Sequence, residues 1–361
     1  MSDPSSSNLR RAAALVLPCL ATVAIAVAIA WWFRKPLVEE ATRNSAIERH
    51  LMPDLDRWVR KPKPGAVRGV FFGDSLTMSL DSIARGGPKG GVPVMVEEAL
   101  RAAGTPVDIL SFTHAAFRPV HLAYVLDEVL AGHPRFAVVE INLRLVAPTW
   151  KAETAFRFLP MSRRISLQRQ IALSPFLREE GLGTFHPNVY RLQEALSLLY
   201  VMDGVRIAGH DWLDTQSARV ERTLGLTRNA RPAQSGELND DAAAYASSLA
   251  DSPSAAILRV LDEELAAAGV WTLYYMSPLN PDGLKAAGVE DPDALAARVD
   301  GLRAASGIPA ERWLDLHAGF PASAFLDQMN HLRPSALRTV AAKVLHKLRP
   351  VLAGREQTAQ P

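Results

Sequence analysis

A serine, a histidine and an asparagine follow short apolar runs at three distant places in the chain, and together they could perform acyl transfer. Ser75 lies in the sequence Gly73-Asp74-Ser75-Leu76, and His331 is the best placed of nine histidines to take its proton. Asp327 could orient that imidazole, and the side-chain amide of Asn142 could donate a hydrogen bond to an oxyanion. Each residue also has a plain structural interpretation: Ser75 as a helix cap, His331 as a packing or surface residue, and Asn142 as the end of a strand.

Two charged residues and a second histidine beside this set leave parts of the assignment open. Asp74 could bind substrate, or it could hydrogen-bond back into its own loop or cap it. Arg144 could clamp a substrate carboxylate or phosphate, or it could be an exposed cation or an ion-pair partner. His317, with Asp315 two residues before it, is a rival base, which we rank well below His331 because we expect the pair to face apart.

The elements that must position these residues are visible as short apolar runs suited to buried parallel strands. Helical periodicity separates several of the runs, notably over His121–Ala131 and Ala255–Ala268, and a C-terminal helix is expected over Pro334–Leu348. This alternation predicts a layered α/β fold with a mainly parallel sheet, whose carboxyl edge would gather the three residues. The expected strands are Val67–Phe72, Val107–Ser111, Phe136–Ile141, Val270–Met276 and Trp313–Leu316.

With Ser75, Asn142 and His331 in this order, the chain resembles the SGNH, or GDSL-type, hydrolase family over residues 66–111, 113–148 and 270–348. The resemblance implies a flavodoxin-like three-layer α/β/α sandwich with the activity of an ester hydrolase or an O-acyltransferase. It further implies that Ser75 is the nucleophile and a backbone oxyanion donor, that Asn142 is the side-chain oxyanion donor, and that His331 is the base.

The chain departs from the family pattern at two places. The second block of the family supplies a glycine N–H to the oxyanion hole, whereas residues 111–117 contain no glycine, so that N–H would come from Ala115 or Ala116. The acid of the family lies three residues before the histidine, where this chain has Gln328, while Asp327 lies four residues before it. Either the loop bulges by one residue and Asp327 serves as the acid, or the serine and histidine act as a dyad.

Composition narrows the classes of partner. The 361 residues include 40 basic and 38 acidic side chains, with a formal net charge of +2 and none of the basic motifs of nucleic-acid binding proteins. The one cysteine, Cys19, excludes an intrachain disulfide framework. No histidine pair with metal-ligand spacing and no glycine-rich phosphate-binding signature appears, so we expect no metal, no cofactor and no nucleic-acid partner.

An uncharged segment of 22 residues from Ala12 to Phe33 is long enough to cross a bilayer, because at 1.5 Å per residue it spans about 33 Å. Tryptophans and cations close it, as they do at membrane interfaces. It predicts a single-pass anchor, with a cleaved signal peptide ending at Ala28-Ile29-Ala30 and lipidation of Cys19 as alternatives. The cations after the span favour a cytoplasmic domain, but the layout of a signal anchor leads us to expect an extracytoplasmic one.

The chain is therefore expected to divide into a tail (1–11), a transmembrane anchor (12–33), a linker (34–65), an SGNH hydrolase-like domain (66–350) and a disordered tail (351–361). The domain would carry a mainly helical and irregular insertion at about 151–253. The leading substrate class is an acyl ester of cell-envelope carbohydrate, with a membrane-bound acyltransferase as an implied partner. The alternatives are a lipid or small-molecule esterase and a catalytically inactive scaffold subunit of an envelope acylation complex.

Overall fold

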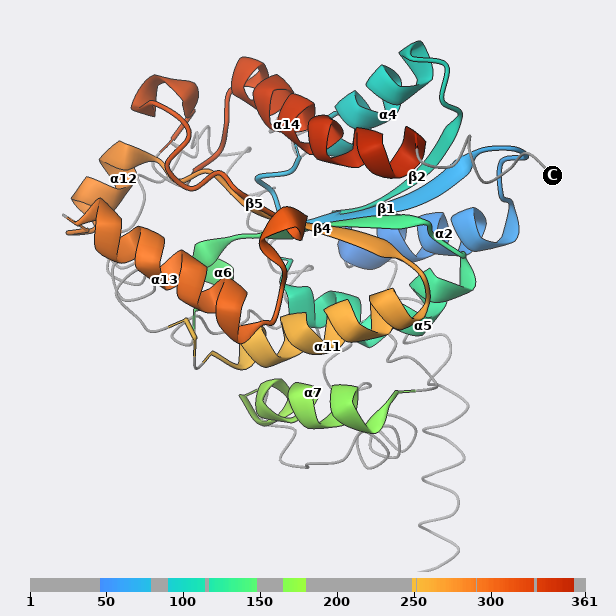
Figure 1. Cartoon of the computed structure of the whole chain (residues 1–361), viewed down its shortest axis with the longest axis horizontal. Coiled ribbons are helices and arrows are strands. Elements are labelled where there is room, and N and C mark those ends of the chain that lie inside the picture. The colour runs from blue at the N-terminus through green and yellow to red at the C-terminus, as the bar shows by residue number, and fades with distance from the viewer. Residues whose placement is uncertain are drawn as a thin grey trace, which may run out of the picture. The chain divides into compact units, whose positions relative to one another are not determined.

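A five-stranded sheet, in which every strand runs parallel to its neighbours, forms the centre of the computed structural model (Figure 1). The structure describes residues 46–78, 90–113, 117–147, 165–179, 249–250, 252–289, 291–327 and 330–353. The predicted strands are confirmed, with differences of one or two residues at their ends. In the order β2-β1-β3-β4-β5 across the sheet, they are β1 (Val67–Gly73), β2 (Val107–Thr113), β3 (Phe136–Ile141), β4 (Trp271–Met276) and β5 (Trp313–Asp315).

Helices cover both faces of the sheet and make the molecule an α/β sandwich (Figure 1). On one face α4 packs against α14, and on the other α5 contacts both α2 and α11. α13 packs against α11, and α7 contacts both α5 and α11. The described helices are α2 (Ala46–Arg60), α4 (Val92–Ala102), α5 (Pro119–Ala131), α6 (Leu143–Val146), α7 (Leu167–Glu179), α11 (Pro253–Ala267), α12 (Pro281–Ala286), α13 (Pro292–Ala305) and α14 (Pro334–Ala353), with 3-10 turns η2 (Ala310–Arg312) and η3 (Ala322–Ala324).

Proline opens five of these helices, because a residue without an N–H is tolerated in the first turn, where that donor has no partner within the helix. α5 and α11 each begin two residues earlier than the apolar periodicity indicated, at Pro119 and Pro253. α14 begins at the predicted residue and continues to Ala353, so residues 351–353 of the predicted tail are helical, and 354–361 lie outside the described residues.

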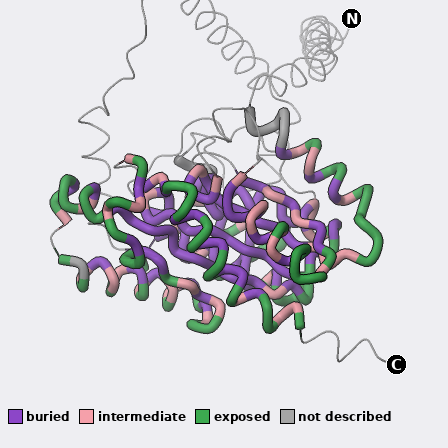
Figure 2. The backbone as a smooth tube through the Cα atoms, turned by 90° about the horizontal axis from the view of Figure 1, so that it is seen from above, coloured by how far each residue is buried: buried purple, intermediate pink, exposed green. Residues whose placement is uncertain are grey.

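The strands of the sheet are buried on both faces, which explains their continuous apolar runs. Successive residues of β1 serve opposite faces: Phe71 joins the core beneath α4 and α14, while Phe72 stacks on Phe112 with ring centroids 5.4 Å apart. All six residues of β3 are buried. Figure 2 shows the buried interior surrounded by helices whose outer faces are exposed.

Part of the predicted linker belongs to the folded unit. α2 contacts β2 and α5, and its Trp58 is buried and donates a hydrogen bond from Nε1 to the carbonyl oxygen of Asp108 at 3.1 Å. The predicted break after the helix is present, because residues 61–66 form turns that lead into β1. α2 is therefore fixed to the sheet rather than acting as a spacer.

The predicted insertion is described only in part, chiefly as helix α7. Arg169 of this helix is 1% exposed and pairs with Asp127 of α5 at 2.8 Å and with Glu264 of α11 at 3.5 Å. This buried cation therefore fixes α7 to the two helices beneath it. The rest of the insertion and the predicted anchor at 12–33 lie outside the described residues, and within those residues no helix is long and apolar enough to span a membrane.

Candidate active site

The structure brings Ser75 and His331 together at the carboxyl edge of the sheet. Ser75 is half-buried in the turn that follows β1, and His331 lies in the loop between η3 and α14. Nε2 of His331 lies 3.1 Å from Oγ of Ser75, although the residues are 256 positions apart in the chain. This distance is within hydrogen-bond reach, so the imidazole can accept the proton of the hydroxyl.

Asp327 completes the line of side chains. Its Oδ2 lies 2.6 Å from Nδ1 of His331, and its Oδ1 accepts a hydrogen bond from the backbone N–H of the same histidine at 3.1 Å. Just before the histidine, Asn330 adopts a left-handed conformation with φ of 71°, which asparagine tolerates better than most residues. Of the two arrangements that the sequence left open, the structure has the one in which Asp327 reaches the imidazole.

Asn280 fixes the loop that carries Asp327 and His331 to the end of β4. Its backbone N–H donates to Oδ1 of Asn330 at 2.6 Å, and its Nδ2 donates to the carbonyl oxygen of Asp327 at 2.7 Å. Both asparagines are buried. The sequence analysis missed this pair. An asparagine before a proline indicated at most a helix cap, and Asn280 does cap α12 by accepting from Asp282 N at 3.0 Å.

Asn142 lies beside the serine turn, and its amide has a defined orientation. Oδ1 accepts from the backbone N–H of Arg144 at 3.1 Å, so the nitrogen must face Asp74, to whose Oδ2 it donates at 2.6 Å. Among the described residues, neither the second N–H of this amide nor the backbone N–H of Ser75 has an acceptor. The role of these two groups as oxyanion donors stays a prediction.

Asp74 supports the turn from within. It is 3% exposed, and its Oδ1 accepts from the backbone N–H of Leu76 at 2.7 Å. Burial raises the pKa of this carboxyl, while the hydrogen bonds from Asn142 and Leu76 act in the opposite direction. Asp74 thus makes the bond back into its own loop that was one of its predicted roles, and both of its carboxylate oxygens have partners inside the protein.

Glu140 is a second buried carboxyl beneath the same turn, and the sequence analysis did not single it out. Its Oε2 accepts hydrogen bonds from the backbone N–H of Asp74, at 2.8 Å, and from the hydroxyl of Thr77. The same hydroxyl also bonds to the phenol of Tyr275 on β4. Burial, followed by the charge of Asp74, raises the pKa of Glu140 well above its usual range. The signal in the sequence was a charged residue inside the apolar strand Phe136–Ile141.

Glu140 also explains why residue 73 is a glycine. A Cβ atom at this position would lie 2.5 Å from Oε2 of Glu140 and 2.6 Å from Oγ1 of Thr77. The φ angle of Gly73 is not in the left-handed region, so the tight turn expected from the sequence is not what requires glycine here. The requirement is the close approach of the buried carboxyl to the backbone.

Of the other predicted residues, Arg144 is half-buried in α6 beside Asn142, and its contact with substrate stays a prediction. Ala115 and Ala116 lie outside the described residues. The expectation that Asp315 and His317 face apart is wrong. Residues two apart along an extended chain lie on the same side, and β5 ends at Asp315, so that Oδ1 of Asp315 lies 2.6 Å from Nδ1 of His317.

The Asp315–His317 pair stabilises its own turn, because the same Oδ1 also accepts from the backbone N–H of His317 at 3.0 Å. Burial raises the pKa of Asp315, but the two hydrogen bonds from His317 together with its charge outweigh burial, so the pKa is lowered overall. The histidine in hydrogen-bond contact with Ser75 is His331.

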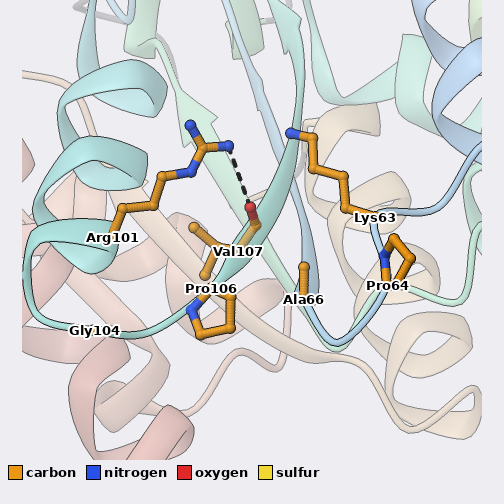
Figure 3. Close-up of a pocket in the computed structure, with 7 residues that line it drawn as sticks. All are labelled: Lys63, Pro64, Ala66, Arg101, Gly104, Pro106 and Val107. Atoms are coloured by element: carbon orange, nitrogen blue, oxygen red, sulfur yellow. Dashed lines mark hydrogen bonds between the residues drawn. The ribbon is translucent and has the colours of Figure 1, made fainter.

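A pocket of about 470 Å³ lies at the opposite edge of the sheet, where β1 and β2 begin (Figure 3). Its two cations are engaged by acids: Lys63 lies 3.0 Å from Oδ1 of Asp108, and Arg101 pairs with Glu97. The pocket is separate from the serine turn, because it lies at the other end of the strands. Since both cations are paired, it offers no unneutralised positive charge to a ligand. Within the described ranges, no group of three or more His, Cys, Asp or Glu side chains is arranged to hold a metal ion.

Comparison of the chain with known protein families finds no family that matches, and comparison with curated proteins finds no match either. The geometry of the serine turn and its neighbours is thus what bears on function. Ser75 and Asn142 follow β1 and β3, the adjacent strands at which the chain changes direction across the sheet, and open α/β sheets bind ligands at this point.

Proposed function

We propose that the protein is a serine ester hydrolase or O-acyltransferase of SGNH type, in which Ser75, His331 and Asp327 act as nucleophile, base and orienting acid. The observation that carries the proposal is the continuous line of contacts from Oγ of Ser75 through the imidazole to the carboxylate of Asp327. The strand order β2-β1-β3-β4-β5 supports it, because this is the order of flavodoxin-like sheets.

The reaction proceeds in two halves. His331 accepts the proton of Ser75 as Oγ bonds to the ester carbonyl carbon, and the protonated imidazole then gives that proton to the departing alcohol, leaving an acyl-serine. In the second half His331 takes a proton from the acceptor, whose oxygen attacks the acyl carbon, and returns it to Oγ of Ser75. Water as acceptor gives a carboxylic acid, and a sugar hydroxyl gives a new ester.

The N–H of Ser75 and the second amide N–H of Asn142 hold the oxyanion in both halves, with a third donor expected from Ala115 or Ala116. Loss of one such donor typically costs about 10²–10³ in rate. The convergence of nucleophile, base and donors favours an enzyme over the inactive scaffold, in which these side chains need not converge.

The substrate that we propose is an acyl ester of cell-envelope carbohydrate, transferred or cleaved by an extracytoplasmic domain anchored through residues 12–33 next to a membrane-bound acyltransferase. This step rests on the sequence and on the family resemblance. A lipid or other apolar ester is the second candidate, because the part of the predicted insertion that is described exposes two large apolar side chains. On α7, Leu167 and Ile171 are 70% and 66% exposed.

The test is turnover of p-nitrophenyl acetate by the full-length chain purified in detergent, beside Ser75→Ala, His331→Ala and the matched control His317→Ala. We expect both site variants to lose at least about 10³-fold in kcat, and the control to keep the wild-type rate within about two-fold. Equal rates in all four proteins would refute the proposed site. A folded but silent wild type would favour the scaffold interpretation.

The same assay separates the candidate substrates. Acetyl transfer to an added oligosaccharide, detected by mass spectrometry, would identify an O-acyltransferase of carbohydrate. A preference for octanoyl over acetyl esters that Leu167→Ser with Ile171→Ser abolishes would instead identify the apolar-ester candidate.

A further inference from the structure

The proposed reaction assigns no step to Glu140, although this residue is the buried acid that touches the nucleophile turn. It lies on β3, the central strand of the sheet, and is 4% exposed. Carboxyl groups are almost never buried to this extent unless they are paired or hydrogen-bonded, because burial removes their hydration. A buried acid retained beneath a reactive serine therefore calls for a role.

Glu140 contacts the chain on both sides of Ser75. Oε2 accepts from the backbone N–H of Asp74, one residue before the serine, and from the hydroxyl of Thr77, two residues after it. One carboxylate oxygen thus contacts both ends of the turn, whose far end is also held by the hydrogen bond from the backbone N–H of Val92 to the carbonyl oxygen of Thr77 at 2.9 Å. The turn presents both reacting elements of the serine, its hydroxyl and its N–H.

The same contacts extend to the second oxyanion donor. Asp74, whose N–H is held by Glu140, uses its carboxylate to accept from the amide of Asn142. A displacement of Asp74 would therefore turn the Asn142 amide as well as move Ser75. Thr77, the second partner of Glu140, is also held to the sheet, because its hydroxyl bonds to the phenol of Tyr275 on β4.

The charge balance at this place indicates a neutral acid. The titratable groups that face Glu140 are Asp74 from the turn and Tyr275 from β4, and neither can supply a positive charge. The charge of His331 acts on Asp74, where it opposes the effect of burial without cancelling it. Oε1 of Glu140 is buried and has no hydrogen-bond partner among the described residues. An ionised carboxylate with an unpaired oxygen beside a second carboxylate would be costly, whereas one proton on the pair relieves the repulsion.

We propose that Glu140 is a positioning residue that, in its protonated form, holds the turn of Ser75 and the amide of Asn142 in the geometry needed for acyl transfer. The inference rests on the proposed function. Its consequence is that a side chain with the shape and neutrality of glutamine can replace the acid, because an amide oxygen accepts the same two hydrogen bonds.

The experiment measures kcat and KM for p-nitrophenyl acetate with full-length wild type, Glu140→Gln, Glu140→Ala and the matched control Glu97→Gln. Glu97 lies on α4 and pairs with Arg101, at the pocket on the opposite edge of the sheet. We expect Glu140→Gln and Glu97→Gln to stay within about three-fold of wild type. We expect Glu140→Ala to lose about 10²-fold in kcat with KM nearly unchanged, the cost of a misplacement of about 1 Å.

Two results would overturn the inference while leaving the proposed function intact. One is a folded Glu140→Ala protein with kcat within about three-fold of an active wild type. The other is a Glu140→Gln protein as impaired as Glu140→Ala, which would mean that the ionised acid is needed. If the alanine variant does not fold, Thr77→Val is the deciding test, because it removes one of the two hydrogen bonds to Glu140 with little change of shape. We expect this variant to lower kcat several-fold, and an unchanged kcat would overturn the inference. A wild type that neither turns over the ester nor reacts with a fluorophosphonate would overturn the inference together with the proposed function.

Discussion

Replacement of Gly73 by alanine should destabilise the protein and impair its turnover together, because the new methyl group would enter the contact between Glu140 and the serine turn. The added Cβ would lie 2.5 Å from Oε2 of Glu140, 2.6 Å from Oγ1 of Thr77 and 2.9 Å from Cβ of Glu140. Carbon atoms pack best at about 3.5–4.0 Å, so the buried glutamate must retreat. It can do so only by giving up bonds to the turn.

The size of the effect follows from two terms. Overpacking of a closed interior costs about 1–3 kcal/mol, and a buried polar group that loses its partner costs about 1–3 kcal/mol more. The sum of about 2–6 kcal/mol is a large part of the 5–15 kcal/mol that stabilises a typical domain. With a urea m-value of about 3 kcal/mol/M, the unfolding midpoint should fall by about 1 M.

Two other glycines provide matched controls. A Cβ on Gly69, four residues earlier in β1, would enter the ring of Phe136, so Gly69→Ala should destabilise the protein about as much. It lies about 13 Å from Gly73 along the strand, and turnover per folded molecule should therefore stay unchanged. Gly301 in α13 has open space at its Cβ position, so Gly301→Ala should stabilise by about 0.5–1 kcal/mol.

The assay combines urea unfolding followed by circular dichroism with ester turnover at a temperature where every variant is folded. A Gly73→Ala protein as stable as wild type would refute the steric argument. Equal loss of turnover in Gly69→Ala and Gly73→Ala would show that activity follows global stability rather than the contact with Glu140.

Three further changes test the surroundings of the site. Asp327→Asn should lower kcat by about 10²–10⁴, whereas Asp315→Asn, the same change in the histidine pair that does not touch Ser75, should leave kcat within about two-fold; equal effects would contradict the assignment. Asn280→Ala should lower kcat about ten-fold, because it removes the hydrogen bond to the carbonyl oxygen of Asp327. Asn280→Asp should not restore kcat, because an aspartate side chain cannot donate that bond. A wild-type rate in either variant would exclude a role of Asn280 in holding Asp327. The pKa of Glu140 is higher in the folded than in the unfolded state, so as the pH rises the unfolded chain loses this proton at a lower pH than the folded protein does. The free energy of unfolding therefore decreases as the pH rises from about 4.5 towards the folded pKa. Between pH 5 and 8, the free energy of unfolding measured with urea should therefore fall more steeply with pH in wild type than in Glu140→Gln, by up to about 1.4 kcal/mol per pH unit. The same pH dependence in both proteins would contradict the raised pKa.

The sheet could be predicted from the sequence because its strands are parallel and buried on both faces. Such strands appear as unbroken apolar runs, and all five runs became strands. The placement of Ser75 and Asn142 followed from the same rule, since each comes after the end of a run. Elements of this kind depend on local composition, which a single sequence contains.

The parts that could not be predicted depend on contacts between distant residues. Asn280 and Asn330 are fifty positions apart, and nothing in the residues around either indicates that a backbone N–H meets a side-chain amide there. The spacing of Asp327 left two arrangements open, because only the folded structure shows that its carboxylate reaches Nδ1 of His331. Glu140 had a detectable signal, a charge inside an apolar strand, but its partners come from the turn after β1.

The separation of 256 positions between Ser75 and His331 also orders events during biosynthesis. At about 5–20 residues per second, roughly 13–50 s pass between the synthesis of Ser75 and that of His331. Throughout this interval the nascent chain carries the hydroxyl without its base, and it also lacks α14, which must still close one face of the sheet. Completion of the fold and formation of the Ser75–His331 contact therefore coincide, so that the proposed nucleophile gains its proposed base only when the sheet is closed.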